Sequence, residues 1–251
     1  VKTLPGTPEI SKELDVLIAE GQYEQAAPRL KQALAAAPQN LAIRFLWARG
    51  LQGLGEFEQA CEELRRLGEL APGYADLWIQ LAIGLNDLQR GPSFIWSSQR
   101  SELIQEALLA MDRAEALVGE GDHMVHLQRG IVLCFAGRFE ESEWDLWKAV
   151  EARPLDGNAY WDIAWVEAQR GDGAAAARAM RFAARDPRLF AMRICQEEVQ
   201  CDPYLEPVLQ DPTFMAWVAR IPGKCLVQET ANGWLEALNK RISYWFRGCS
   251  R

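Results

Sequence analysis

A short block of sequence recurs at a fixed spacing, and this repetition limits the possible folds more than any other feature. Residues 21–26, GQYEQA, return 34 residues later as residues 55–60, GEFEQA. Related blocks begin at Gly137 and Gly171, which are again 34 residues apart. A unit of this length holds two helices of about 13 residues joined by a turn, and it cannot bury its apolar side chains alone. Neighbouring units must therefore stack.

Glycine, alanine and proline mark fixed points within each unit. The glycine that opens each block predicts the end of the first helix of a pair. The small residue five positions later predicts a close crossing of the two helices, as at Ala26 and Ala60, and we place Ala107 in the same role. A proline twelve residues further on cannot continue the second helix, which it therefore ends. These prolines are Pro38, Pro72 and Pro154.

This pattern resembles the tetratricopeptide repeat family, most clearly over residues 41–74. That unit has Trp47-Ala48 at the family's Leu-Gly pair, followed by Gly55, Phe57, Ala60, Leu64, Leu67 and Pro72. The resemblance covers about residues 7–188 in about five units, at 7–40, 41–74, 75–114 with an insertion, 123–156 and 157–188. It implies an all-α fold, a right-handed α-α superhelix, that acts in protein–protein interaction.

Two segments depart from the repeat. The insertion near 89–101 contains Gly91-Pro92, which cannot continue a helix, and Ser98 or Ser101 could cap the next one. Its apolar Phe94, Ile95 and Trp96 are expected to pack on the solenoid or on a partner.

Residues 189–251 are expected to form a helical terminating module. The Asp-Pro pairs at 186, 202 and 211 predict helix starts, since aspartate caps well and proline suits the first helical position. An amphipathic helix at about 233–247 ends the chain. We expect this helix to cap the solenoid by docking on the chain's own body, because its apolar side chains need burial. Contact with a membrane or partner is the alternative, since residues 224–251 carry five basic and two acidic side chains.

Composition excludes several classes of protein. The net charge of −8 argues against a general nucleic-acid binder, and no apolar run approaches the roughly 18 residues that cross a bilayer. We expect a cytoplasmic location, although a start at Val1 leaves room for an upstream targeting segment. No CxxC pair is present. Cys61 and Cys134 are expected to act as small core residues, and a Cys195–Cys201 disulfide is left open.

Catalysis has little support in the sequence. His123 and His126 could share a helix face and bind a metal with Asp122 or Glu120, but an ordinary helix start explains them better, because no further ligands are suitably spaced. No glycine-rich phosphate loop is present. We therefore predict a protein that is not an enzyme and needs no cofactor or metal.

The resemblance implies that the first helices of the units line a groove that binds a protein or peptide. Family members that capture a peptide's carboxylate use Lys, Arg and Asn at these positions. Of these residue types, the groove positions of this chain hold only Arg49 and two asparagines. Whether the groove is open or filled by the chain itself stays undecided, and Trp161 and Trp165 are the predicted aromatic anchors. The predicted groove residues are Phe45, Arg49, Gln52, Asp76, Ile79, Ile83, Asn86, Met124, Leu127, Ile131, Cys134, Asn158, Trp161 and Trp165.

Adaptor, scaffold or assembly factor is the expected function. The first alternative is a peripheral membrane assembly factor that uses the last helix, and the second is a helical enzyme that uses the histidine pair.

Overall fold

A computed structural model describes residues 9–90, 99–186 and 205–218, and within these ranges all regular structure is helical. The chain divides into two compact units, Val1–Gln128 and Arg129–Arg251, with the boundary inside one helix. A boundary near residue 188, where the period lapses, stays a prediction. The insertion residues Phe94, Ile95 and Trp96, the cysteines at 195 and 201, and the helix expected at 233–247 lie outside the described residues.

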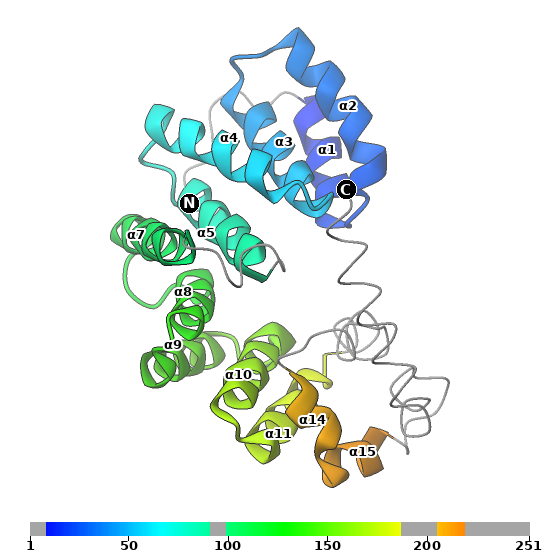
Figure 1. The fold of residues 1–251 in the computed structure, drawn as a ribbon. Coiled ribbons are helices and arrows are strands. Elements are labelled where there is room, and N and C mark those ends of the chain that lie inside the picture. The colour runs from blue at the N-terminus through cyan, green and yellow to red at the C-terminus, as the bar shows by residue number, and fades with distance from the viewer. Residues whose placement is uncertain (1–8, 91–98, 187–204, 219–251) are drawn as a thin grey trace. The chain divides into compact units, whose positions relative to one another are not determined.

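The first unit is built from antiparallel helix pairs (Figure 1). Each helix packs against the next along the chain, and α3 also contacts the first helices on either side of it, α1 and α5. The pairs fall where the 34-residue period predicts them. The helices are α1 (Glu9–Ala19), α2 (Tyr23–Ala36), α3 (Leu41–Gly53), α4 (Phe57–Leu70), α5 (Ala75–Arg90) and α7 (Arg100–Val118).

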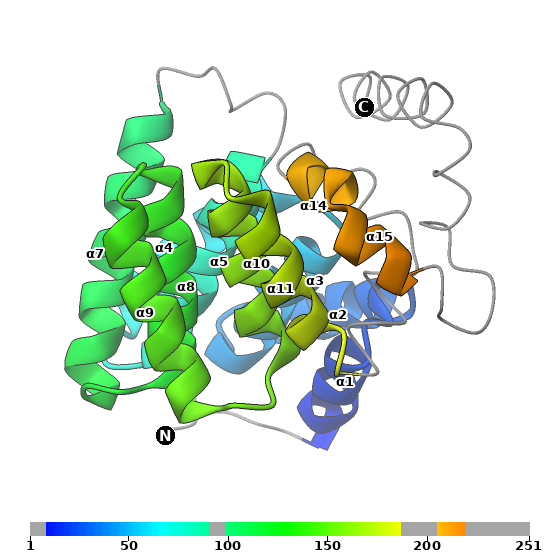
Figure 2. The same cartoon turned by 90° about the horizontal axis from the view of Figure 1, so that it is seen from below.

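The second unit continues the pairing (Figure 2). Helix α10 packs between α9 and α11, while the short α14 and α15 pack on α11. Helix α8 contains the unit boundary. The helices are α8 (His123–Phe135), α9 (Phe139–Ala152), α10 (Gly157–Arg170), α11 (Gly173–Ala183), α14 (Glu206–Gln210) and α15 (Pro212–Val218).

The turns within the pairs use glycine because their backbone has positive φ. Gly21, Gly55, Gly137 and Gly171 have φ values of 73°, 80°, 72° and 86°. Side chains with a Cβ rarely adopt this region, so the predicted helix stops are confirmed.

Side-chain caps fix several helix starts. The Asn40 Oδ1 accepts hydrogen bonds from the backbone N–H groups of Ala42 and Ile43 at 3.0 and 3.2 Å. The predicted start at Asp211-Pro212 is confirmed, because Asp211 Oδ1 accepts from the Phe214 N–H at 2.7 Å. Ser101 as a cap is wrong. Helix α7 already begins at Arg100, and its N-cap residue makes no side-chain capping bond.

One core cluster of the first unit lies between α1, α2 and α3. Its buried residues are Leu14, Ile18, Ala26, Leu30 and Leu46. Ala60 and Ala107 also have no exposed surface, which confirms that these two positions are buried. The period therefore places small residues where the helices have no room for larger ones.

In the second unit, α8 and α9 cross closely at Gly130. A Cβ on Gly130 would lie 2.7 Å from the Leu146 Cγ. The Ser142 Oγ donates a hydrogen bond to the Gly130 carbonyl at 2.6 Å. Ser142 takes the small-residue position of this repeat, so its hydroxyl binds a backbone group that a larger side chain would push away.

We expect Ala60→Leu to destabilise the protein by about 1–3 kcal/mol, because three extra carbon atoms must enter a fully buried site. Thermal unfolding followed by circular dichroism measures the effect. Gln59→Leu is the matched control, since Gln59 is the exposed neighbour on the same helix. Equal melting temperatures for the two variants would contradict the assigned register.

Candidate functional site

The predicted groove face of α3 is partly open. Phe45 and Arg49 are both half-buried, and the guanidinium carbon of Arg49 lies 5.9 Å from the centre of the Phe45 ring. Arg49 Nη1 also contacts Asp15 Oδ1 of α1 at 2.6 Å. The one cationic groove residue of α3 is therefore already committed to an ion pair within the chain.

Two further polar groove residues of the first unit also bond to neighbouring first helices. Gln52 Nε2 donates to the Gln80 carbonyl of α5 at 2.8 Å. Asn86 Nδ2 donates to Gln128 Oε1 of α8 at 3.1 Å, and both of these side chains are buried. These contacts tie successive first helices together. The side-chain amides of Gln52 and Asn86 therefore donate hydrogen bonds that hold neighbouring repeats together.

The groove residues differ widely in exposure. Two are exposed, Asp76 and Asn158. Five are half-buried: Phe45, Arg49, Gln52, Ile83 and Met124. Seven are buried: Ile79, Asn86, Leu127, Ile131, Cys134, Trp161 and Trp165.

The two tryptophans of α10 are interior residues in the structure. Trp161 is 4% exposed and Trp165 is 2% exposed. The Trp165 ring meets the Phe135 ring edge to face, with centroids 5.0 Å apart. Both indoles therefore contribute to packing, and their contact with a ligand stays a prediction.

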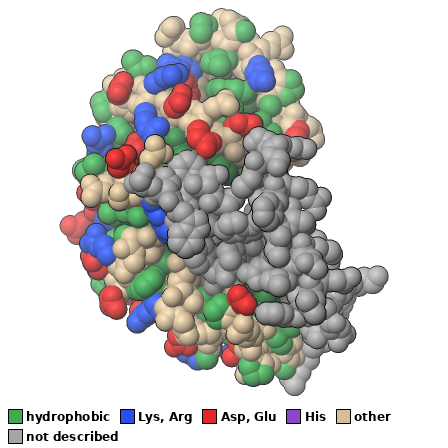
Figure 3. Space-filling view, in the orientation of Figure 1, with side chains coloured by type: hydrophobic (Ala, Val, Ile, Leu, Met, Phe, Trp, Pro, Cys, Tyr) green, Lys and Arg blue, Asp and Glu red, His purple; other side chains and the backbone are tan. Residues whose placement is uncertain are grey.

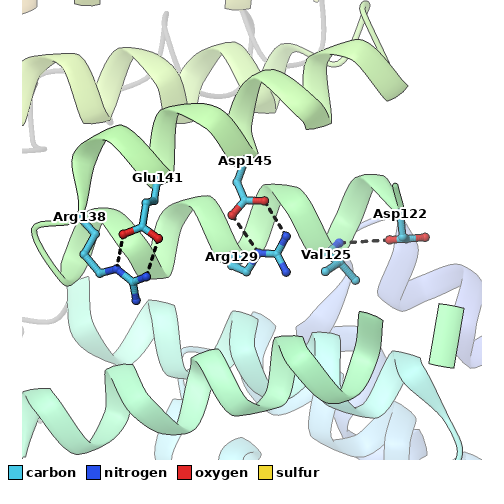
Figure 4. A network of polar contacts seen from close by, with 6 residues as sticks. All are labelled: Asp122, Val125, Arg129, Arg138, Glu141 and Asp145. Atoms are coloured by element: carbon cyan, nitrogen blue, oxygen red, sulfur yellow. Dashed lines mark hydrogen bonds and ion pairs between the residues drawn. The ribbon is translucent and has the colours of Figure 1, made fainter. Parts of the chain in front are cut away.

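A buried ion pair joins α8 to α9 in the second unit (Figure 4). Arg129 Nε and Nη2 donate to Asp145 Oδ2 and Oδ1, each at 2.8 Å. The Asp145 side chain is 4% exposed and that of Arg129 is 16% exposed. A two-pronged pair of this kind holds the two helices in one register.

Glu167 on α10 is buried with little compensation. Burial raises the pKa of its carboxyl, and the nearby negative charge of Glu143 raises it further. Arg170 lies 3.7 Å from Glu167 but only 2.9 Å from Glu143, so its charge is shared between the two carboxylates. Folding therefore raises the pKa of Glu167 above the ordinary value of 4.5.

We expect Glu167→Gln to raise the melting temperature at neutral pH. A raised pKa in the folded state means that stability falls as pH rises from the ordinary value of 4.5 through the folded-state value. The gain from Glu167→Gln should therefore shrink as pH falls below 4.5. Glu141→Gln is the control, because the Arg138 hydrogen bond lowers the pKa of the exposed Glu141. An unchanged or lower melting temperature for Glu167→Gln at neutral pH would contradict the assignment.

Histidine, cysteine and long apolar helices give no further candidate site among the described residues. His123 and His126 are buried at the start of α8, and within the described ranges no group of three or more His, Cys, Asp or Glu residues could hold a metal ion. Cys61 and Cys134 are buried thiols, as predicted, and burial raises the pKa of the Cys61 thiol to about 12. None of the described helices is long and apolar enough to span a bilayer.

Charged side chains of both signs are interspersed with apolar ones on the described surface in Figure 3.

The predictions from sequence missed one group of exposed aromatic residues in the second unit. Trp144 and Trp147 of α9 are 57% and 45% exposed. A helical projection of residues 139–152 would have found them, because both lie on the side of the helix opposite the buried Ala149.

Comparison with known proteins bears on the fold. The tetratricopeptide repeat family model matches residues 17–83. No curated protein sequence matches the chain.

Three solved structures show the same fold at low sequence identity. TTC0263, a tetratricopeptide repeat protein of Thermus thermophilus, is 21% identical with a TM-score of 0.64, over 80% of this chain and 97% of that one. MamA 41-end from Desulfovibrio magneticus RS-1 is 14% identical with a TM-score of 0.52, over 73% and 98%. MamA MSR-1 C2 is 18% identical with a TM-score of 0.50, over 71% and 95%.

The glycine turns, the small residues at the helix crossings and the family match agree with one another. Residues 17–83 therefore match the tetratricopeptide repeat family, and the described residues have the all-α fold of a tetratricopeptide repeat solenoid.

Proposed function

We propose that this chain is a protein–protein interaction module that acts as an adaptor, scaffold or assembly factor. The proposal rests chiefly on the half-exposed face of α3 and α5 in the first unit. Phe45, Arg49 and Gln52 of α3 and Ile83 of α5 are half-buried, and Asp76 of α5 is exposed. Stacked repeats make such a row of side chains continuous, which suits an extended or helical segment of a partner.

The internal hydrogen bonds favour an apolar ligand over a charged one. Arg49 is paired with Asp15, and Gln52 is bonded to the Gln80 carbonyl. A ligand carboxylate would have to share the Arg49 guanidinium with the Asp15 carboxylate, whose negative charge would repel it. Contact with the Phe45 ring and the Ile83 side chain meets no such repulsion, so apolar side chains of the partner are the expected anchors.

Affinity capture with matched variants tests the proposal. The full chain is used as bait in a lysate, beside Phe45→Ala and the control Leu70→Ala. Leu70 is 59% exposed on α4, a second helix, so its truncation leaves the proposed face intact. A protein captured by the wild type and Leu70→Ala but lost with Phe45→Ala supports the assignment. The captured protein is then purified, and its affinity is measured by calorimetry.

Truncation of a central aromatic anchor is expected to weaken that affinity by about tenfold or more. Equal affinity of purified partner for Phe45→Ala and wild type, with unchanged helix content, would remove this face from the proposal.

The alternative function is that of a peripheral membrane protein, which would use the amphipathic segment at 233–247 to bind lipid. Sedimentation of the full chain with anionic liposomes, compared with a chain ending at residue 223, separates the two. Loss of sedimentation in the shorter chain would favour the membrane role. A protein or peptide partner, no nucleic acid and a cytoplasmic location remain parts of the main proposal.

A further inference from the structure

Three aromatic side chains from successive helices of the second unit are in contact. The Trp147 ring of α9 meets the Tyr160 ring of α10 edge to face, with centroids 6.4 Å apart. The Tyr160 ring stacks on the Phe182 ring of α11 at 5.3 Å, with an angle of 21° between the planes. We call Trp147, Tyr160 and Phe182 the aromatic ladder. Because its rings come from three helices, the repeat stack fixes their spacing.

The aromatic ladder is open to solvent at both ends. Trp147 is 45% exposed and Phe182 is 42% exposed, while Tyr160 between them is half-buried. These residues also differ from the tryptophans of α10, which are almost fully buried. Large rings that stay half in water contribute little to the core, and exposed aromatic groups are typical of protein interaction surfaces.

Two arginines flank Phe182 at one end of the aromatic ladder. Arg178 lies one turn before Phe182 and Arg185 one turn after it, and both are exposed. The guanidinium carbon of Arg185 lies 4.3 Å from the centre of the Phe182 ring. Helix α11 has no acidic residue, and among the described residues no ion pair engages Arg178, Arg181 or Arg185. Arg178 is close enough to Glu167 to lower the pKa of that carboxyl, but not to form an ion pair with it.

We propose that the aromatic ladder, Arg178 and Arg181 of α11, and Arg185 just after this helix form a second docking surface, for an acidic peptide segment of a partner protein that carries aromatic side chains. The rings offer apolar and edge contacts to the peptide's aromatic groups. The guanidinium groups offer paired hydrogen bonds to its carboxylates. This surface lies on elements other than α3 and α5, so the inference stands independently of the proposed function.

Charge favours an acidic peptide over the chain's own last segment as the occupant. Residues 224–251 carry five basic and two acidic residues, a net charge of +3. A positive segment would be repelled by the arginines of α11, whereas an acidic peptide is attracted to them.

Fluorescence polarisation with synthetic peptides tests the surface in the full chain. The probe is a labelled peptide in which glutamate alternates with phenylalanine. One comparison peptide has lysine in place of glutamate, and the other has alanine in place of phenylalanine. We expect measurable binding of the first peptide only, and weaker binding of that peptide at high salt.

Variants then assign the binding to the surface. Phe182→Ala, and Trp147→Ala at the other end of the aromatic ladder, should each weaken binding of the glutamate–phenylalanine peptide by about tenfold. Arg185→Glu should weaken it as well. The controls are Leu109→Ala, whose side chain is 57% exposed on α7, and Arg66→Glu on α4, and both should bind as the wild type does.

Several results would overturn the inference. These are no binding of the glutamate–phenylalanine peptide, equal binding of the lysine peptide, or unchanged binding in Arg185→Glu. Sedimentation equilibrium provides a further check. A dimer that Phe182→Ala dissociates would assign the aromatic ladder to a second copy of the chain instead. Loss of peptide binding with Phe182→Ala but not with Phe45→Ala would separate this surface from the one on α3.

Discussion

Trp165→Ala is expected to lower the free energy of unfolding by about 3–5 kcal/mol, because it removes an indole that is 2% exposed and leaves a cavity on α10. The edge-to-face contact with Phe135 is lost as well. Denaturant unfolding followed by circular dichroism measures the loss.

Trp144→Ala is the matched control for this prediction. It makes the same chemical change on α9, but its side chain is 57% exposed, so the expected loss is below about 1 kcal/mol. Similar stabilities for the Trp165 and Trp144 variants would contradict an interior position for Trp165. If partner binding were lost in Trp165→Ala while stability stayed unchanged, the indole would instead be a groove anchor.

Asp145→Ala is expected to cost about 3–5 kcal/mol, because it leaves the Arg129 guanidinium largely buried without its two-pronged acceptor. Removal of both charges avoids that penalty. The double variant Arg129→Met with Asp145→Leu should therefore recover most of the stability, since apolar side chains of similar volume can replace a buried ion pair. Denaturant unfolding of the single and double variants measures the difference.

The ion pair between Arg138 and Glu141 provides the control. It is two-pronged like the buried pair, with distances of 2.7 and 2.6 Å, but both side chains are about half exposed or more. Water screens this pair, so Glu141→Ala should change stability little. A double variant as unstable as Asp145→Ala would show that the packing of α8 on α9, rather than the charge pair, sets the stability there.

Local chemistry in the sequence determined the helix pairs. Gly21, Gly55, Gly137 and Gly171 turn the chain because they have no Cβ, and the structure gives each of them a positive φ. Pro38, Pro72 and Pro154 each stand two residues past the last residue of a second helix, at Ala36, Leu70 and Ala152. These effects act within a few residues, so a 34-residue period is enough to reveal them.

Tertiary structure alone decided which groove residues are accessible. The sequence placed Arg49 and Trp161 on the same kind of surface, because both lie at the same kind of position in their first helices. Arg49 is half-buried and bound to Asp15, whereas Trp161 is 4% exposed. The exposure of a side chain depends on which residues the neighbouring repeat places against it, and a repeat pattern does not contain that information.

The contact of Trp147, Tyr160 and Phe182 has the same origin. Each residue occurs in a different helix, and no sequence spacing links the three. Their rings meet because α10 packs between α9 and α11. The period of the sequence thus determined how each helix pair folds. The stacking of the repeats decided which side chains meet, because those contacts depend on residues that lie far apart in the chain.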